Sequence, residues 1–366
     1  MTEEKPVEVS RAGVVEYSAA PSRLMPAEWD RHEATWIAWP HHKPDWPGKL
    51  EAIPWVYAEI VRVLHSHERV EILCNDDGVR QRAAAALDAH GVSPDGYRLH
   101  TVRTDRVWLR DSAPTFVRHE DGKVEMVSWQ FNAWAKYENY EYDEKLGGTL
   151  ERITSIPRVT AMRPGTATPL VLEGGGIEAN GAGRVLVTEE WLLSDVQVRN
   201  PGMTREAYEA AFSFYLGATE TIWLGNGCVG DDTHGHIDDV ARFSAPDTVL
   251  LAFEADANDA NHPASVDNLQ RLERASDGAL KIVKLPYPRP VMMDGQRLPA
   301  SYANFYVANG VVLVPTFNDG MDRHALDIIA GEFPDRDVVG IHSVDLVWGL
   351  GTIHCLTQQQ PSSESP

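Results

Sequence analysis

Short apolar runs rich in β-branched and aromatic residues alternate along this chain with longer segments of helical periodicity, and this alternation most limits the folds open to it. The runs predict strands at residues 34–39, 70–74, 124–129, 169–173, 184–188, 248–253, 280–285 and 311–315. The segments between them predict helices at 49–67, 78–90, 204–216, 265–275 and 322–332. The sequence therefore predicts a mixed α/β fold.

Tight turns join several of these strands in pairs. In the stretch L-E-G-G-G-I-E-A-N-G-A-G-R-V-L-V (172–187), glycine-rich turns separate apolar runs, and a helix and another strand follow. This order predicts a repeated β-β-α-β unit, although the letters themselves do not repeat. Because no Ser/Gly-rich or Pro-rich linker divides the 366 residues, we expect one domain over 24–361, with a flexible N-terminal segment (1–23) and a flexible tail (362–366).

The charge of the chain narrows its possible partners. The sequence has 54 Asp and Glu against 33 Lys and Arg, a net charge of -21. Such a charge repels nucleic-acid backbones and anionic membranes and favours the approach of small cations, so we expect neither nucleic acid nor membrane as a partner. The first 24 residues lack the apolar stretch of a signal peptide, and no run reaches the roughly 18 apolar residues of a membrane helix. The expected location is the cytoplasm.

The stretch D-D-T-H-G-H-I-D-D (231–239) concentrates titratable side chains and leaves two interpretations open. His234 and His236 nearly match the His-x-His arrangement of metal-dependent hydrolases, but the third histidine of that pattern is missing. A metal-free catalytic cluster is the alternative interpretation.

The three cysteines, Cys74, Cys228 and Cys355, are too few and too scattered for a disulfide framework. Cys74 lies in the run V-E-I-L-C and is expected in the core. Cys355 follows the glycine-rich turn G-L-G (349–351), a setting in which backbone can be exposed at the mouth of a site. Cys355 is therefore the candidate nucleophile.

Isolated carboxylates also end two apolar runs, at Asp111 in W-L-R-D and at Glu173 before three glycines. Asp111, Glu173, His236 and Cys355 are separated by 62, 63 and 119 residues, the last interval being close to twice the others. An array of equivalent units that each deliver one residue to a central axis would produce this spacing.

Several motifs together resemble the agmatine deiminase family, which is related to bacterial peptidylarginine deiminases within the guanidine-modifying superfamily. The resemblance covers about residues 24–361. Its motifs are M-P-A-E-W-D-R-H-E-A-T-W-I-A-W-P (25–40), W-L-R-D-S-A-P-T-F (108–116), L-E-G-G-G-I-E (172–178), G-D-D-T-H-G-H-I-D-D (230–239), S-Y-A-N-F-Y-V-A-N-G (301–310) and G-T-I-H-C-L-T-Q-Q-Q-P (351–361).

The resemblance implies a five-bladed α/β propeller, the pentein fold, built from pseudo-symmetric β-β-α-β units around a negatively charged channel. It implies a hydrolase that converts agmatine to N-carbamoylputrescine and ammonia, in the biosynthesis of putrescine and other polyamines. It further implies a homodimer with no cofactor and no metal at the site. One alternative is a deiminase that uses the same chemistry on a peptidylarginine or on another guanidine. The other alternative is an enzyme of a different class, a metal-dependent hydrolase that uses His234 and His236.

The resemblance also implies roles for five catalytic residues. Asp111 and Asp238 would hold the planar guanidinium by paired, charge-assisted hydrogen bonds. The thiolate of Cys355 would attack the guanidinium carbon. His236 would protonate the departing ammonia and then deprotonate water, and Glu173 would orient His236 or assist these proton transfers.

Three further residues are expected to bind substrate. Trp108 would lie against the guanidinium or its alkyl stem, Asn304 would reach the nucleophile or the substrate, and Asp232 would accept the far ammonium of agmatine. The sequence departs from common family patterns at Gly-Leu-Gly-Thr (349–352), where Gly-Gly-Gly-Asn is frequent, and at Asp239 and Glu178, where Asn and His are frequent.

Overall fold

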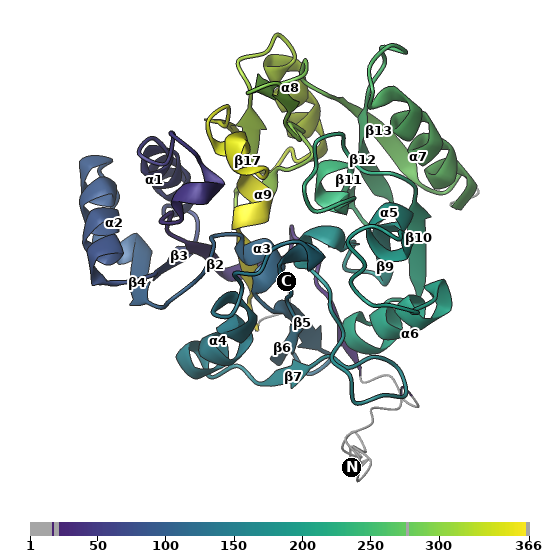
Figure 1. Ribbon diagram of the computed structural model, residues 1–366, viewed down its shortest axis with the longest axis horizontal. Helices are drawn as coiled ribbons and strands as arrows, with labels where there is room; N and C mark the ends of the chain where they lie inside the picture. Colours follow the sequence, from purple (N-terminus) through teal and green to yellow (C-terminus); the bar gives the residue numbers. More distant parts are fainter. Residues whose placement is uncertain (1–16, 18–21, 276–277, 364–366) are drawn as a thin grey trace.

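Strands and helices alternate along the chain of the computed structural model, which describes residue 17, residues 22–275 and residues 278–363 (Figure 1). The strands are β1 (Arg23–Leu24), β2 (His32–Ala38), β3 (Arg69–Cys74), β4 (Tyr97–Thr101), β5 (Thr115–His119), β6 (Val124–Ser128), β7 (Arg158–Thr160), β8 (Glu178–Ala179), β9 (Arg184–Thr188), β10 (Glu220–Leu224), β11 (Ala241–Ala245), β12 (Thr248–Phe253), β13 (Lys281–Pro286), β14 (Met292–Met293), β15 (Gln296–Arg297), β16 (Tyr306–Ala308), β17 (Val311–Thr316), β18 (Asp337–His342) and β19 (Gln358–Pro361).

The α-helices are α1 (Ile53–Leu64), α2 (Asp77–Ala89), α3 (Leu109–Ser112), α4 (Leu146–Thr154), α5 (Glu189–Leu193), α6 (Arg205–Leu216), α7 (His262–Ala275), α8 (Asp322–Glu332) and α9 (Ile353–Leu356). Three short 3₁₀ turns matter for the site, namely η3 (Ala133–Ala135), η5 (Gly174–Gly176) and η6 (Ile237–Asp239).

Five sheets of the described residues share one order of connections. In four of them an antiparallel pair of consecutive strands is followed by a helix and by a third strand that is parallel to the second, and these sheets are β5-β6-β7, β8-β9-β10, β11-β12-β13 and β16-β17-β18. In the fifth, β19 is antiparallel to β2, and β3 and β4 follow in parallel. The predicted β-β-α-β unit is confirmed, and both ends of the chain contribute to its fifth copy.

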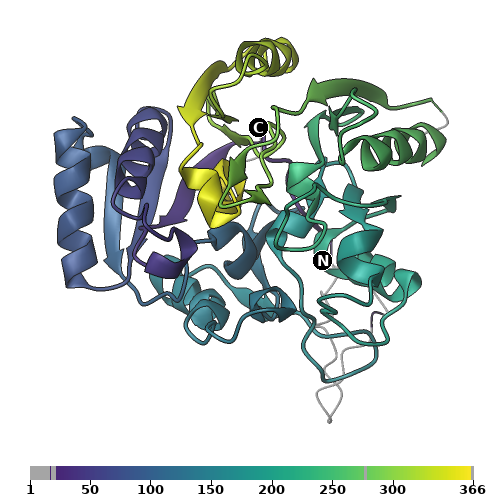
Figure 2. The same cartoon turned by 45° about the horizontal axis from the view of Figure 1, so that its top comes forward.

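The units lie around a common centre. In Figure 1, α3 and α9 occupy that centre while α2, α4, α6, α7 and α8 lie toward the periphery, and Figure 2 shows the same arrangement tilted. Chain closure depends on short pairings, since Gln358 of β19 pairs with Trp36 of β2, and β1 pairs with β5. The ribbon β14-β15 is an additional two-stranded sheet.

Helix α1 illustrates how the sequence pattern becomes packing. Ile53, Tyr57, Ile60, Val61 and Leu64 follow one another at helical spacing and are all fully buried. This apolar stripe covers the sheet of β2, β3 and β4 and forms part of one hydrophobic cluster with it. Burial of such a stripe stabilises a helix more than its intrinsic propensity does.

All five predicted helices are present, and seven of the eight predicted strands are present with small shifts at their ends. The prediction of a strand over 169–173 is wrong, because this segment forms only isolated bridges at Pro169 and Val171. The side chain of Asn200 binds both the N–H and the carbonyl of Val171, at 3.0 and 2.7 Å, and so replaces a partner strand. The chain then turns into η5.

The predicted flexible termini are only partly described. Tyr17 stacks on Phe214 with ring centroids 4.6 Å apart, and Arg23 begins β1. At the other end, the N–H of Ser362 donates to the carbonyl of Arg31 at 2.8 Å. Residues 1–16, 18–21 and 364–366 lie outside the described residues. Among the described helices, none is both long and apolar enough to cross a bilayer.

Arg242 of β11 joins three units through charges buried at the centre. Its side chain is fully buried, with Nε 2.8 Å from Oε2 of Glu178 and Nη2 2.9 Å from Oε1 of Glu28. It also donates to the carbonyl oxygens of Ala303 and Phe305, ahead of β16. Burial lowers the pKa of Arg242, but Glu178 and Glu28 outweigh burial and raise it.

We expect Arg242→Met to lower the free energy of unfolding by about 3–5 kcal/mol, because two buried carboxylates would lose their shared cation. Urea unfolding followed by circular dichroism measures the shift of the midpoint. The matched control is Arg323→Met, whose side chain is 83% exposed in an ion pair with Asp327 and which should cost less than about 1 kcal/mol. Equal midpoints for the two variants would contradict a structural role for Arg242.

Candidate active site

Each residue that meets the others at the centre lies just ahead of the first strand of its own β-β-α-β unit. Asp111 precedes β5, Glu173 precedes β8, Asp238 precedes β11, Asn304 precedes β16 and Cys355 precedes β19. The short turns that carry them touch one another, since α3 contacts α9 and η5, and η5 contacts η6. The long interval in the sequence spacing therefore contains one more member of the array, Asn304.

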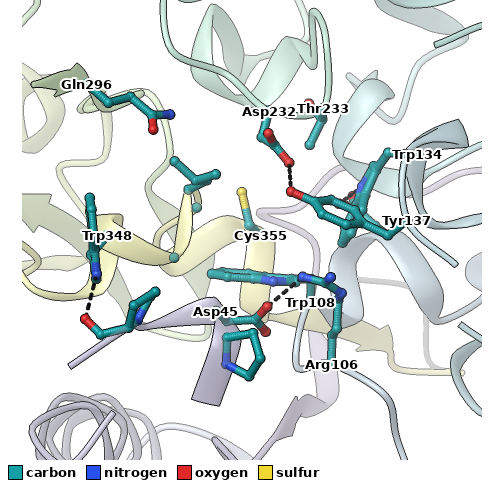
Figure 3. Close-up of a pocket in the computed structure, with 16 residues that line it drawn as sticks. Asp45, Arg106, Trp108, Trp134, Tyr137, Asp232, Thr233, Gln296, Trp348 and Cys355 are labelled. Atoms are coloured by element: carbon teal, nitrogen blue, oxygen red, sulfur yellow. Dashed lines mark hydrogen bonds and ion pairs between the residues drawn. The ribbon is translucent and has the colours of Figure 1, made fainter. Parts of the chain in front are cut away.

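A hollow of about 240 Å³ opens over this centre (Figure 3). Its lining includes Asp111, Cys355, Trp108, Asp232 and Tyr137. In Figure 3 the sulfur of Cys355 lies in the middle of the view, between the ring of Trp108 and the carboxylate of Asp232. The structure thus brings the candidate nucleophile and two of the predicted carboxylates to one cavity.

Glycines let the backbone approach the candidate catalytic side chains. A Cβ at Gly175 would lie 2.7 Å from both Asp111 Oδ1 and His236 Nδ1, so no other residue fits there without a shift. The N–H of Gly175 donates to Asp111 Oδ1 at 3.0 Å. In the turn before Cys355, a Cβ at Gly351 would lie 2.8 Å from the ring of Trp108. The glycines of L-E-G-G-G and G-L-G are therefore required by close packing.

The loop that delivers His236 is folded around Asp231. The carboxylate of Asp231 accepts from the N–H groups of Thr233, Gly235 and His236, at 2.8, 2.8 and 3.0 Å. Gly235 has a left-handed φ of 97°, and its carbonyl accepts from the hydroxyl of Thr188. This turn points His236 toward the centre.

His234 lies in the same turn but its side chain meets a different group of residues. Its Nε2 is 3.0 Å from Ser194 Oγ, and its Nδ1 is 3.7 Å from Glu190. His236 instead faces Asp111 and Glu173. Within the described ranges, no group of three His, Cys, Asp or Glu side chains is arranged to hold a metal ion. The two histidines do not form the paired metal ligands that their spacing could suggest.

Cys355 is buried between an acidic and an amide group. Its Sγ lies 3.4 Å from Asp238 Oδ2, and Asn304 Nδ2 donates to it at 3.1 Å. Burial raises the pKa of the Cys355 thiol well above its usual range, and the nearby charges of Asp238, Asp239 and Asp111 raise it further. Before a substrate binds, the group is therefore a thiol at neutral pH.

His236 lies among carboxylates that keep it protonated. Its Nε2 is 3.5 Å from Glu173 Oε2 and its Nδ1 is 3.7 Å from Asp111 Oδ1. Burial lowers the pKa of His236, but Asp111, Glu173 and Asp238 outweigh burial and raise the pKa to about 9. At neutral pH the imidazole therefore carries a proton that it can donate.

Glu173 is fully buried and fully paired. Arg199 Nε donates to its Oε1 at 3.0 Å, and Trp191 Nε1 donates to its Oε2 at 2.6 Å. Burial raises the pKa of Glu173, but the charge of Arg199 and the hydrogen bond to His236 lower it to about 2. Such a carboxylate stays ionised, which suits it to orient His236 and not to accept a proton.

Asp111 and Asp238 differ in their surroundings although both are buried. Among the described residues, Asp111 accepts hydrogen bonds from two neutral donors, Gly175 N–H and Trp134 Nε1, the latter at 2.8 Å, and His236 Nδ1 lies 3.7 Å from it. Burial raises its pKa to about 6, and Asp238 and Glu173 add to the increase. Burial also raises the pKa of Asp238, but the hydrogen bond and charge of His354 outweigh it and lower the pKa.

His354 is a central residue that the sequence reasoning missed. Its Nδ1 lies 2.8 Å from Asp238 Oδ2, and its Nε2 lies 2.8 Å from Glu28 Oε2. The ring therefore bridges two buried carboxylates that belong to segments far apart in the chain. Only its position beside Cys355 could have drawn attention to it. Trp134, Trp191 and Arg199, which hold Asp111 and Glu173, were also missed.

The residues expected to bind the rest of the substrate lie at the rim. Trp108 lines the hollow and packs on Trp46 with ring centroids 5.5 Å apart. Asp232 also lines it, but its carboxylate is already paired with the ammonium of Lys136 and accepts from Tyr137 Oη at 2.7 Å. Figure 3 shows the bond between Asp232 and Tyr137.

The chain is similar to known proteins over nearly its whole length. Residues 24–361 match the family described as Porphyromonas-type peptidyl-arginine deiminase. The chain is 34% identical to the agmatine deiminase of Stutzerimonas stutzeri (strain A1501), over 92% of this chain and 95% of that protein. It superposes on the solved agmatine deiminase of Enterococcus faecalis with a TM-score of 0.86 and 28% identity, over 95% of this chain and all of the other.

A more distant likeness extends to the fold alone. The structure of SxtG, an amidinotransferase from Microseira wollei, aligns over 92% of this chain and 96% of that chain with a TM-score of 0.52 and 12% identity. The mixed α/β fold is therefore common to deiminases and an amidinotransferase. The match over residues 24–361 shows that the chain belongs to the Porphyromonas-type peptidyl-arginine deiminase family.

Proposed function

We propose that this protein is an agmatine deiminase, which hydrolyses agmatine to N-carbamoylputrescine and ammonia. The observation that carries the proposal is the hollow in which Cys355 and Asp111 lie together, with Asp238 and His236 in contact with them. The relatives named agmatine deiminase, matched over nearly the whole chain, support the choice of substrate.

The base of the hollow suits a planar cation. Within the described part of the chain, no lysine or arginine forms an ion pair with Asp111. One buried carboxylate oxygen nearby, Asp238 Oδ1, has no hydrogen-bond partner in that part of the chain. Buried polar atoms are normally paired, so a guanidinium whose N–H groups reach Asp111 and Asp238 would complete the site.

The first chemical step is attack of Cys355 on the guanidinium carbon. The positive charge of the bound guanidinium favours the thiolate that the surrounding carboxylates otherwise oppose, so on substrate binding the Cys355 thiol releases its proton to solvent and becomes the nucleophile. A C–S bond forms, and the tetrahedral adduct collapses by breaking a C–N bond of the terminal amino group. His236 gives its proton to that nitrogen, and ammonia leaves the amidino-enzyme.

The second step releases the product. His236, now neutral, takes a proton from a water molecule, and the resulting hydroxide attacks the amidino carbon. The C–S bond breaks, the hydroxyl proton passes to the departing sulfur, the carbon keeps the oxygen as a carbonyl, and the Cys355 thiol is regenerated. Glu173 holds the ring of His236 in place through both steps, because it stays ionised and is itself held by Arg199.

The proposal also covers how the five units of the chain are arranged. The five β-β-α-β units form the blades of a propeller over residues 24–361, which the common centre in Figure 1 supports. The site lies on its axis, because each unit places one residue ahead of its first strand. The homodimer and the cytoplasmic location stay predictions of the sequence.

The nucleophile and the substrate of the proposed reaction can be tested together. We expect metal-free enzyme to release ammonia and N-carbamoylputrescine from agmatine, and Cys355→Ser to lower kcat by about a thousandfold or more. Cys74→Ala, in β3 and away from the hollow, should keep its activity. Faster turnover of an arginine peptide than of agmatine would contradict the assignment of agmatine as the substrate. Loss of activity on chelation, with recovery on added zinc, would contradict the metal-free mechanism.

The proposal also predicts how kcat/KM for agmatine depends on pH. We expect kcat/KM for agmatine to fall below about pH 6, because protonation of Asp111 removes the negative charge that pairs with the guanidinium. It should also fall above about pH 9, where His236 loses the proton that ammonia needs to leave. Initial rates between about pH 5 and 10, with enzyme integrity checked at each pH, measure both limbs. A profile without a change near pH 6 would exclude Asp111 from guanidinium binding.

A further inference from the structure

Two of the carboxylates that line the hollow are already neutralised by the chain itself. Asp232 is paired with Lys136, and Asp45 is paired with Arg106. The guanidinium of Arg106 also lies over the ring of Tyr137, 4.1 Å from its centroid. Asp111 at the base lacks such a partner among the described lysines and arginines. The two rim carboxylates thus have a lysine or arginine partner, whereas Asp111 at the base has the imidazole of His236 at 3.7 Å.

The segment that carries Lys136 has a strained backbone. Ala133, Trp134 and Ala135 of η3 have φ angles of 51°, 59° and 54°, in the left-handed region that residues other than glycine rarely adopt. Such strain persists only where surrounding contacts impose it. Here Trp134 Nε1 donates to Asp111 at 2.8 Å, and Asn132 Oδ1 accepts from the N–H of Ala135 at 2.9 Å.

A second contact ties this segment to Asp232. The side-chain Nε2 of Gln197 donates to the backbone carbonyl of Trp134 at 3.0 Å and to the backbone carbonyl of Asp232 at 3.1 Å. The next two residues after η3, Lys136 and Tyr137, then both bind the Asp232 carboxylate. Contacts of the surrounding backbone therefore hold Lys136 and Asp232 beside each other.

This contact matters for a substrate with two charges. With its guanidinium at Asp111, agmatine directs its far ammonium toward the rim of the same hollow, where Asp232 is a lining carboxylate. The group already bound to Asp232 is also an alkylammonium. Two ammonium groups at one carboxylate repel each other, so the substrate must share or displace Lys136.

We propose that Lys136 is a specificity-determining residue that competes with the far ammonium of the substrate for Asp232. The proposal rests on the function proposed above. In the free enzyme Lys136 neutralises Asp232, and on binding it yields that carboxylate to agmatine. The competition weakens agmatine binding and narrows the preference for dicationic guanidines over guanidines with an uncharged tail.

The test compares agmatine with 1-butylguanidine, which has the same guanidinium and four-carbon stem but no far ammonium. We expect Lys136→Met to raise the ratio of kcat/KM for agmatine to kcat/KM for 1-butylguanidine by about three- to tenfold, mainly through a lower KM for agmatine. Lys136→Arg keeps the charge and should keep the ratio close to that of the wild type.

Two controls separate competition from a change in overall charge or folding. Lys281→Met removes the same charge from an exposed pair with Glu332 and should leave the ratio unchanged. In an Asp232→Asn background, Lys136→Met should no longer alter the ratio, because the shared carboxylate is gone.

An unchanged or lower ratio in Lys136→Met would overturn the proposal. An unchanged ratio together with a loss of turnover of free arginine would instead assign Lys136 to a substrate carboxylate, and would overturn it as well. Failure of the wild type to act on either guanidine would refute the proposed function itself, which is a distinct result.

Discussion

Burial of many carboxylates at one centre is the constraint on which the rest of the structure depends. An ionised carboxylate away from water is costly unless a cation or several donors meet it. Glu173 has Arg199, Asp238 has His354, and Glu28 and Glu178 share Arg242. Asp111 has only neutral donors and His236. Among the described residues, each carboxylate of this group except Asp111 thus has an arginine or histidine nitrogen within hydrogen-bond distance, whereas His236 Nδ1 lies 3.7 Å from Asp111. The oxygens of Asp111, at the base of the hollow, are therefore left to a cationic substrate.

The order of connections explains how distant segments supply this centre. Each β-β-α-β unit begins with a strand whose preceding turn carries a central residue, and both ends of the chain complete the fifth unit through β19 and β2. Because the turns are short and glycine-rich, backbone and side chains approach within hydrogen-bond distance there. The strict packing around Gly175 and Gly351 shows why glycine recurs beside the catalytic side chains.

The sequence predicted much of the site for a physical reason. Asp111, Glu173, His236 and Cys355 stand at regular intervals because equivalent units have similar lengths, and Asn304 completes the array within the longest interval. His354 was missed because its role comes from two carboxylates 116 and 326 residues away in the chain. The strand expected at 169–173 failed because Asn200, and not a neighbouring strand, binds the backbone of Val171.

The sequence by itself determined the α/β class, the repeating unit, the family and several of the residues that converge at the centre, because local periodicity and motif spacing are properties of the chain. Only the tertiary structure decided which charges are compensated. Asp232 and Asp111 look alike in the sequence, yet Lys136 neutralises the first while the second has no lysine or arginine partner among the described residues. The difference arises because ionic interactions depend on distance and burial, which segments far apart in the chain set only when they pack together.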